Sequence, residues 1–155
     1  MYNVKIYGAG SIGNHLANAS RRMGWDVTIC DLDPAALQRT REEIYPARYG
    51  QWDESIQLCT ANEAPRKGFD LIFIGTPPDS HMDLAIQAIA EKPKAVLVEK
   101  PLCTPEMEKA DELYSLARQT GVEVFVDHSL PFGGYFCEVR KRDPFTSAEL
   151  EMISD

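Results

Sequence analysis

The sequence lacks paired cysteines, an excess of basic residues and any long apolar run, and each absence excludes a class of protein. The four cysteines (Cys30, Cys59, Cys103 and Cys137) lie far apart with no Cys-x-x-Cys spacing, which argues against a zinc knuckle or a redox pair and favours free thiols. Lysine and arginine number 16 against 24 acidic residues, for a net charge of -8, which disfavours a nucleic-acid surface. No stretch approaches the roughly 20 apolar residues that span a bilayer, and no signal-peptide pattern opens the chain. We therefore expect a cytoplasmic protein with no metal, nucleic-acid or membrane partner.

What is present is a chain with the length of one domain. Its 155 residues are 44% hydrophobic, enough to bury about two thirds of the unfolded surface. Short runs of Val and Ile alternate with amphipathic stretches, which predicts a parallel sheet with crossover helices. Several runs are continuously apolar, as in strands covered by helices on both faces. We predict a doubly wound α/β Rossmann fold with strands at residues 3–7, 26–31, 55–60, 70–75, 94–99 and 122–127.

Three apolar stripes at helical spacing predict the core faces of the crossover helices. Asp33–Pro34 and Thr104–Pro105 each place a capping side chain before a proline at the first helical position, which predicts two helix starts. Residues 44–54 suggest a helix end and an irregular connection. After residue 127 no strand pattern follows, so we divide the chain into a domain at 1–128 and a tail, or the start of a truncated second domain, at 129–155. The stripes are Ile12, Leu16, Ala19, Met23, then Met82, Ala85, Ile86, Ile89, and then Met107, Ala110, Tyr114, Ala117.

A glycine-rich turn joins the first predicted strand to the first predicted helix. Residues 8–13 read Gly-Ala-Gly-Ser-Ile-Gly, the G-x-G-x-x-G pattern in the context that a dinucleotide site requires. Gly8 permits the tight turn, Gly10 lets the backbone approach a pyrophosphate, and Gly13 lets helix and strand pack closely. With Ser11 and Ile12, these glycines are predicted to bind the cofactor at the helix N-terminus.

An acidic residue follows at the end of the second predicted strand. Asp31 lies about 20 residues beyond the glycines, where a carboxylate accepts hydrogen bonds from an adenosine ribose. Its charge disfavours the 2'-phosphate of NADP, so NAD is favoured, although Arg39 or Arg41 could soften that preference. Asp33 is the better candidate for the helix cap. A methyltransferase that uses S-adenosylmethionine combines the same two features and stays open at this point.

Further candidates follow the later strands, because ligands of open α/β sheets lie beyond the carboxyl ends of the strands. Thr76, Pro77 and Pro78 form a stiff turn that leads to His81. Glu99-Lys100-Pro101 follows the fifth predicted strand, and His128 follows the sixth.

Three of these features belong together: the glycine turn, the Thr-Pro-Pro stretch up to His81 and above all Glu99-Lys100-Pro101. With them, residues 2–132 resemble the N-terminal domain of the Gfo/Idh/MocA oxidoreductases. The resemblance implies a nicotinamide cofactor, a Lys100 that approaches the substrate hydroxyl and the nicotinamide, and a cis Lys100–Pro101 bond. It adds Thr76, Pro77, Pro78, His81, Glu99 and Lys100 to the predicted cofactor contacts. A methyltransferase has no obvious use for the Glu-Lys-Pro motif.

The chemistry of alcohol oxidation gives these side chains roles. The hydroxyl must lose a proton as the nicotinamide accepts hydride, and we predict that Lys100 polarises or deprotonates it, with a pKa lowered by burial. His128 is a second catalytic candidate, with a loop cap as its alternative. His81 is equally compatible with a place near the nicotinamide and with a structural role. A surface lysine at a strand end is the alternative for Lys100.

The sequence departs from the family pattern in two places. Pro131 stands where the family's Gly-His-x-x-Arg-Phe pattern has arginine, and the family's C-terminal α+β domain is missing from the 155 residues. A fragment, a site completed by a partner chain and a binding module without catalysis are all compatible with this. We expect an NAD(P)-binding domain of an oxidoreductase acting on a hydroxyl or ketone of a sugar, cyclitol or similar molecule. The alternative is a non-catalytic dinucleotide-binding or assembly module. An uncovered apolar surface would favour a homo-oligomer.

Overall fold

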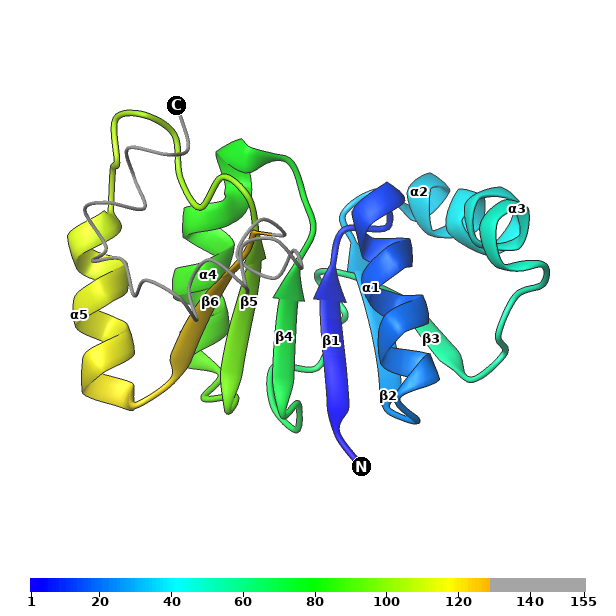
Figure 1. Cartoon of the computed structure of the whole chain (residues 1–155), viewed down its shortest axis with the longest axis horizontal. Helices are drawn as coiled ribbons and strands as arrows, with labels where there is room; N and C mark the ends of the chain where they lie inside the picture. The colour runs from blue at the N-terminus through cyan, green and yellow to red at the C-terminus, as the bar shows by residue number, and fades with distance from the viewer. Residues whose placement is uncertain (129–155) are drawn as a thin grey trace, which may run out of the picture.

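A six-stranded parallel sheet forms the centre of the chain, in the order β3-β2-β1-β4-β5-β6 (Figure 1). The structure, a computed structural model, describes residues 1–128, so the predicted second unit at 129–155 and the departure at Pro131 lie outside it. The strands are β1 (Asn3–Tyr7), β2 (Asp26–Asp31), β3 (Ile56–Thr60), β4 (Leu71–Ile74), β5 (Ala95–Glu99) and β6 (Glu123–Asp127). The predicted fold and all six strands are confirmed, with bounds that differ by one residue at most.

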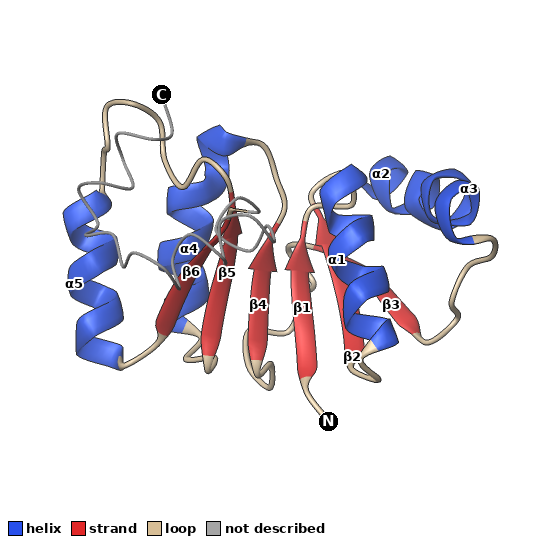
Figure 2. Cartoon of the chain, viewed as in Figure 1, coloured by secondary structure: helices blue, strands red, loops and turns tan. Residues whose placement is uncertain are grey.

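Helices cover both faces of this sheet (Figure 2). In the view of Figure 1, α1 lies in front of β1 and β2, whereas α4 lies behind β4 and β5. The strand order reverses between β1 and β4, which creates the topological switch point of a doubly wound fold. The helices are α1 (Ser11–Arg22), α2 (Pro34–Arg39), α3 (Tyr45–Tyr49), α4 (His81–Ala90) and α5 (Ala110–Thr120), with a π-helical segment at Thr40–Ile44 and a 3-10 turn at Pro78–Ser80.

The predicted core face of α1 is confirmed only in part: Ile12 and Leu16 are half-buried, and Leu16 packs against the core. Ala19 is exposed and Met23 is 66% exposed, whereas the buried residues of α1 are Gly13, Asn14, Ala17 and Ser20. A helix that packs this closely on a sheet buries small residues, so apolar spacing alone placed the stripe at the edge of the buried side. The α4 stripe is confirmed, with Met82, Ala85 and Ile89 buried and Ile86 half-buried.

Of the two predicted helix starts, one is confirmed. The Asp33 carboxylate accepts a hydrogen bond from the Ala35 amide at 2.9 Å and caps α2. The start at Thr104–Pro105 is wrong, because Met107 and Lys109 adopt positive φ angles of 52° and 63° and α5 begins only at Ala110.

The third predicted stripe needs correction, whereas the prediction for residues 44–54 does not. In α5, Leu113 is the buried residue, and the predicted core residues Tyr114 and Met107 are 64% and 62% exposed. The helix end and irregular connection predicted at residues 44–54 are confirmed, because α3 ends at Tyr49 and no helix or strand follows before Ile56. The Tyr45 ring packs edge-on against the rings of Tyr49 and Trp52.

One charged side chain lies inside the sheet and was not predicted. Lys5 in β1 is 0% exposed, and its ammonium group forms an ion pair with Glu91, whose side chain is 5% exposed. The ammonium also donates to the Pro65 carbonyl at 3.0 Å and lies 4.9 Å from the centre of the Phe69 ring. The Tyr7 hydroxyl donates to the other Glu91 oxygen at 3.2 Å. This polar cluster joins β1 to the end of α4.

No helix within residues 1–128 is long and apolar enough to cross a membrane.

Candidate functional site

A cavity of about 840 Å³ opens at the carboxyl edge of the sheet, at the switch point between β1 and β4. This is the place where open α/β sheets bind their ligands, and the volume lies within the range of cofactor pockets. The glycine turn, the end of β2, the turn after β4 and the inner side of α4 form its walls. Its lining includes Gly8, Gly10, Asp31, Thr76 and Pro77 among the predicted site residues, and Arg39, Asn62 and Arg66 among the others.

The three glycines of the turn serve different purposes. Gly8 has a φ of 103°, and a Cβ added there would lie 2.8 Å from the Gly75 carbonyl oxygen. A Cβ on Gly13 would lie 1.8 Å from the Gly8 carbonyl oxygen, so Gly13 packs against the turn and does not line the cavity. A Cβ on Gly10 would meet nothing within 4 Å. Gly10 therefore leaves open the space into which a ligand can approach the backbone.

The beginning of α1 is free to bind an anion. Gly10 is the N-cap, no side chain caps the helix, and its first turn holds no acidic residue. The first amides of a helix have no partner within the helix, and the helix dipole favours negative charge beside them. The chain thus meets the requirement of a pyrophosphate at this end of α1. Ser11 and Ile12 belong to this first turn, and neither side chain lines the cavity.

Two buried side chains beneath the glycine turn were not predicted. The Asn14 amide nitrogen donates to the Gly10 carbonyl at 2.8 Å and to the Ala9 carbonyl at 3.2 Å, and the Thr40 hydroxyl also donates to the Ala9 carbonyl. Both side chains are 0% exposed. They fix the path of the turn from inside, and no sequence pattern singled them out.

Asp31 links the glycine turn to the start of α2. One carboxylate oxygen accepts from the Ala9 amide at 2.8 Å and the other from the Asp33 amide at 2.9 Å. A carboxylate has about four acceptor positions, so these two bonds leave capacity for a ribose. The sequence argument left Asp31 free for the ligand, whereas the structure shows that it also holds two turns in place.

The turn after β4 presents Thr76 and Pro77 to the cavity, whereas Pro78 begins the 3-10 turn and does not line it. The Ser80 hydroxyl donates to the Thr76 hydroxyl at 2.7 Å. His81 is 0% exposed and is absent from the cavity wall.

The residues predicted to act on the substrate lie at the neighbouring strand ends. Glu99 of β5 pairs in register with Asp127 of β6, which brings Lys100 and His128 to adjacent positions at this edge. Neither lines the cavity, and neither does Glu99. The Lys100–Pro101 peptide bond is cis, as predicted. Lys100 is exposed, so the burial predicted for it is not provided by residues 1–128.

The inner wall of the cavity contains Tyr7 and Cys30. Burial, and next the nearby Cys59 thiol, raises the pKa of Cys30, whose sulfur lies 3.4 Å from that of Cys59. A thiol held in its protonated form is a poor nucleophile, so Cys30 contributes packing to the wall. Residues 1–128 contain no group of three or more His, Cys, Asp and Glu side chains that could hold a metal.

Comparison with known proteins places the chain in a family. The sequence model described as "Oxidoreductase family, NAD-binding Rossmann fold", GFO_IDH_MocA, matches residues 2–128. No curated protein sequence matches the chain.

Solved structures share its fold. An oxidoreductase from Bacillus cereus is 28% identical, with a TM-score of 0.67 over 91% of this chain and 39% of that one. The WlbA dehydrogenase from Bordetella pertussis, solved with NADH and UDP-GlcNAcA, is 22% identical, with a TM-score of 0.69 over 89% and 39%. The biliverdin reductase from Synechocystis, solved with biliverdin and NADP+, is 20% identical, with a TM-score of 0.66 over 90% and 42%. The chain thus spans about two fifths of the length of these proteins. By its sequence match and by the geometry of its glycine turn, the chain belongs to the Gfo/Idh/MocA oxidoreductase family and is an NAD(P)-binding Rossmann domain.

Proposed function

We propose that the chain binds NAD across the carboxyl edge of the sheet and serves hydride transfer to or from a hydroxyl or ketone carbon. The cavity at the uncapped start of α1 carries this proposal, because its glycine turn, its open space at Gly10 and its acidic residue suit a pyrophosphate and a ribose. When bound, the nicotinamide supplies the hydride acceptor or donor. Ser11, Ile12 and Gly13 contribute the first turn of α1, and Asp31 contributes the ribose acceptor.

NAD is proposed ahead of NADP because of the charge at Asp31. Its carboxylate lies in the cavity wall at the end of β2, where it would repel a 2'-phosphate. Arg39 and Arg66 also line the cavity and soften this preference, but Arg39 lies 3.9 Å from the Asp33 carboxylate.

Lys100 is proposed to polarise or deprotonate the substrate hydroxyl, with His128 on the adjacent strand end as a second proton carrier. Glu99 and Pro101 fix the turn that carries Lys100. We propose a sugar, a cyclitol or a similar polar molecule as the substrate. The resemblance to the family supports this class, as does the sugar-nucleotide complex of the Bordetella pertussis dehydrogenase.

A titration followed by an assay tests the proposal. We expect NADH fluorescence to change when NADH binds to the chain. The dissociation constant for NADH should lie at least about tenfold below that for NADPH, a difference of about 1.4 kcal/mol in binding free energy. In a hydride-transfer assay with a panel of polyols, Lys100→Met should lower the rate by at least about 100-fold and leave the NADH affinity within about twofold. Lys94→Met, at the opposite end of β5, should change neither value.

A non-catalytic dinucleotide-binding or assembly module is the second candidate function. It is favoured by the exposure of Lys100, which lines neither the cavity at the glycine turn nor the groove beside α5. Binding of NADH without turnover of any polyol would support this candidate and contradict the catalytic one. Absence of NADH binding would contradict both.

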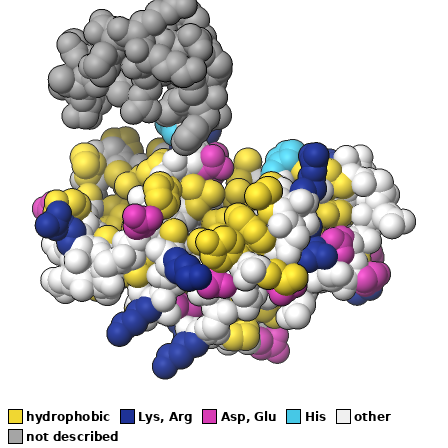
Figure 3. Space-filling model, turned by 60° about the horizontal axis from the view of Figure 1, so that its bottom comes forward, with side chains coloured by type: hydrophobic (Ala, Val, Ile, Leu, Met, Phe, Trp, Pro, Cys, Tyr) yellow, Lys and Arg dark blue, Asp and Glu magenta, His cyan; other side chains and the backbone are white. Residues whose placement is uncertain are grey.

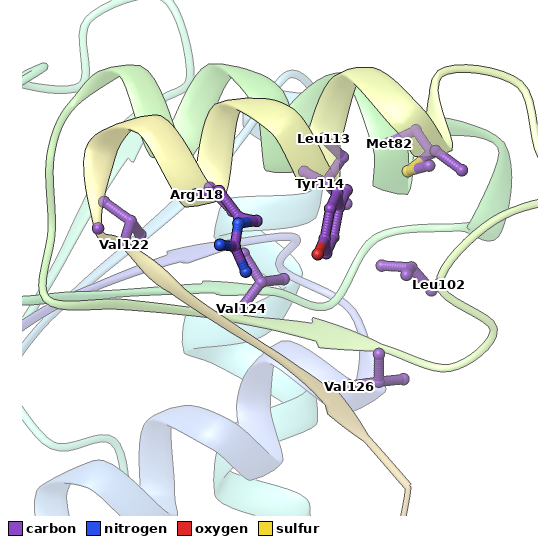
Figure 4. Close-up of a pocket in the computed structure, with 11 residues that line it drawn as sticks. Met82, Leu102, Leu113, Tyr114, Arg118, Val122, Val124 and Val126 are labelled. Carbon is purple, nitrogen blue, oxygen red and sulfur yellow. The ribbon is translucent and has the colours of Figure 1, made fainter. Parts of the chain in front are cut away.

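We further propose that the chain self-associates through an apolar groove between α5 and β6. The groove holds about 510 Å³ and is lined by Met82, Leu102, Leu113, Tyr114, Val124 and Val126, among others (Figure 4). Tyr114 is 64% and Val126 is 37% exposed, and hydrophobic side chains also gather on the face that Figure 3 presents. Exposed apolar patches of this kind mark association surfaces.

The free thiols Cys30, Cys59 and Cys103 support our proposal of a cytoplasmic location.

Size-exclusion chromatography with light scattering checks the association. The wild-type chain should shift from monomer to dimer as its concentration rises, and Tyr114→Glu should remain monomeric because it places a charge in the groove. Met23→Glu makes the same change at a residue that is 66% exposed at the end of α1 and should dimerise like the wild type. A wild-type chain that stays monomeric at millimolar concentration contradicts the proposal.

A further inference from the structure

His81 connects the two turns that carry the cofactor and the proposed catalytic lysine. It is the first residue of α4, directly behind the turn after β4, and its ring is completely buried. One ring nitrogen, Nε2, lies 2.7 Å from the carbonyl oxygen of Thr76, and the other, Nδ1, lies 2.7 Å from the carbonyl oxygen of Pro101. A carbonyl oxygen only accepts, so both contacts are hydrogen bonds when both ring nitrogens carry a proton.

These two carbonyls belong to different strand ends. Thr76 follows β4 and lines the cavity, whereas Pro101 follows Lys100 in the turn after β5. Neighbouring parallel strands have their carboxyl ends at the same edge of the sheet, but the backbone pairing of β4 with β5 ends at Ile74 and Val98. Beyond those residues, within 1–128, the two ring nitrogens of His81 make the only side-chain contacts at hydrogen-bond distance between the two turns. In the neutral ring one nitrogen donates, and in the imidazolium both do.

From this geometry we infer that His81 is a positioning residue that sets the distance between the cofactor-binding turn and the Lys100 turn. Its side chain does not line the cavity. This inference rests on the proposed function, in which the nicotinamide end of the cofactor reaches from Thr76 towards Lys100. A histidine that only filled the core would need neither carbonyl, and an aliphatic side chain would satisfy the same burial at lower desolvation cost.

Two amide variants separate the two bonds. In His81→Asn the amide nitrogen replaces Nδ1 and keeps the Pro101 contact, whereas in His81→Gln it replaces Nε2 and keeps the Thr76 contact. Each variant retains a buried polar side chain of similar size, and each breaks the link at one end. His15→Asn, at an exposed histidine of α1, is the matched control.

The measurement compares NADH with ADP-ribose, which lacks the nicotinamide. We expect both His81 variants to bind NADH about tenfold more weakly, the loss of one buried hydrogen bond, and to bind ADP-ribose within about twofold of wild type. In ¹H–¹⁵N spectra, each variant should shift amides both in residues 75–80 and in residues 99–103. His15→Asn should leave both affinities unchanged.

Equal weakening of NADH and ADP-ribose, or unchanged NADH binding, would overturn the inference, and so would amide shifts confined to one of the two turns. A wild-type chain that does not bind NADH would refute the proposed function and with it the positioning role. A wild-type chain that binds both ligands while the variants bind like the wild type would refute the positioning role alone.

Discussion

Gly13→Ala should lower the free energy of unfolding by at least about 3 kcal/mol, at the upper end of what overpacking costs. The added Cβ would lie 1.8 Å from the Gly8 carbonyl oxygen. The oxygen belongs to the backbone of the turn, and the position of the Cβ is fixed by the backbone of α1. No side-chain rotation relieves the clash, so either α1 or the turn must move. Because that turn approaches the proposed pyrophosphate, NADH affinity should fall with stability. Urea denaturation followed by circular dichroism measures the first effect, and NADH titration measures the second.

Gly10→Ala is the matched control for that substitution. It adds the same methyl group three residues earlier, where nothing lies within 4 Å and φ is -82°, so the free energy of unfolding should change by less than about 0.5 kcal/mol. NADH affinity should still fall by at least about tenfold, since the methyl group occupies the space left for the cofactor. Equal stability of the Gly13 variant and the wild type would contradict the packing argument. Unchanged NADH binding by the Gly10 variant would contradict the placement of the cofactor.

Glu91→Ala should be the most destabilising substitution outside the site, with a loss of about 3–5 kcal/mol. It leaves the Lys5 ammonium completely buried with only the Pro65 carbonyl as a hydrogen-bond acceptor. It also removes the acceptor of the Tyr7 hydroxyl. Burial, and next the Glu91 carboxylate, raises the pKa of Tyr7, so the phenol remains a donor that needs an acceptor. Thermal and urea unfolding measure the loss.

Two further variants show whether the cost comes from the unpaired charge. Lys5→Met combined with Glu91→Leu removes both charges and should recover most of the stability, because well-packed apolar groups often replace a buried ion pair without loss. Glu54→Gln breaks an exposed ion pair, in which the side chain of Glu54 is 74% exposed and that of Arg41 is 54% exposed. This variant should have no measurable effect on the free energy of unfolding. A double variant as unstable as Glu91→Ala would show that packing, and not charge, dominates at this position.

The sequence predicted the features that depend on local pattern. Continuous apolar runs identified the six strands, and the glycine spacing identified the turn that the cavity adjoins. It failed where tertiary packing decides. The buried side of α1 consists of small and polar residues that a count of apolar side chains cannot detect. The Thr104–Pro105 pair resembles a helix start in sequence, but the chain makes two turns before α5.

Long-range contacts account for the remaining omissions. Lys5 and Glu91 lie 86 positions apart, and no sequence pattern indicates that a lysine in a strand is completely buried. Gly75 is close to Ile12 and Gly13 only because β4 lies beside β1. His81 presented two equal interpretations in the sequence, and its contacts with two carbonyl groups from distant segments could not be predicted from it.

The register of β5 with β6 determines how close the chain lies to Lys100 where it leaves the sheet. Glu99 and Asp127 are direct partners, so the backbone leaves the sheet at His128 beside the turn that carries Lys100. A functional group attached by a few residues to this exit point behaves as a tethered reactant, with an effective concentration in the millimolar range for a short flexible connection. A group on a separate molecule with no affinity for the chain would need that concentration in solution to meet Lys100 as often. The register of β5 with β6 therefore gives any group tethered close to His128 an entropic advantage at Lys100 over an untethered group of the same chemistry.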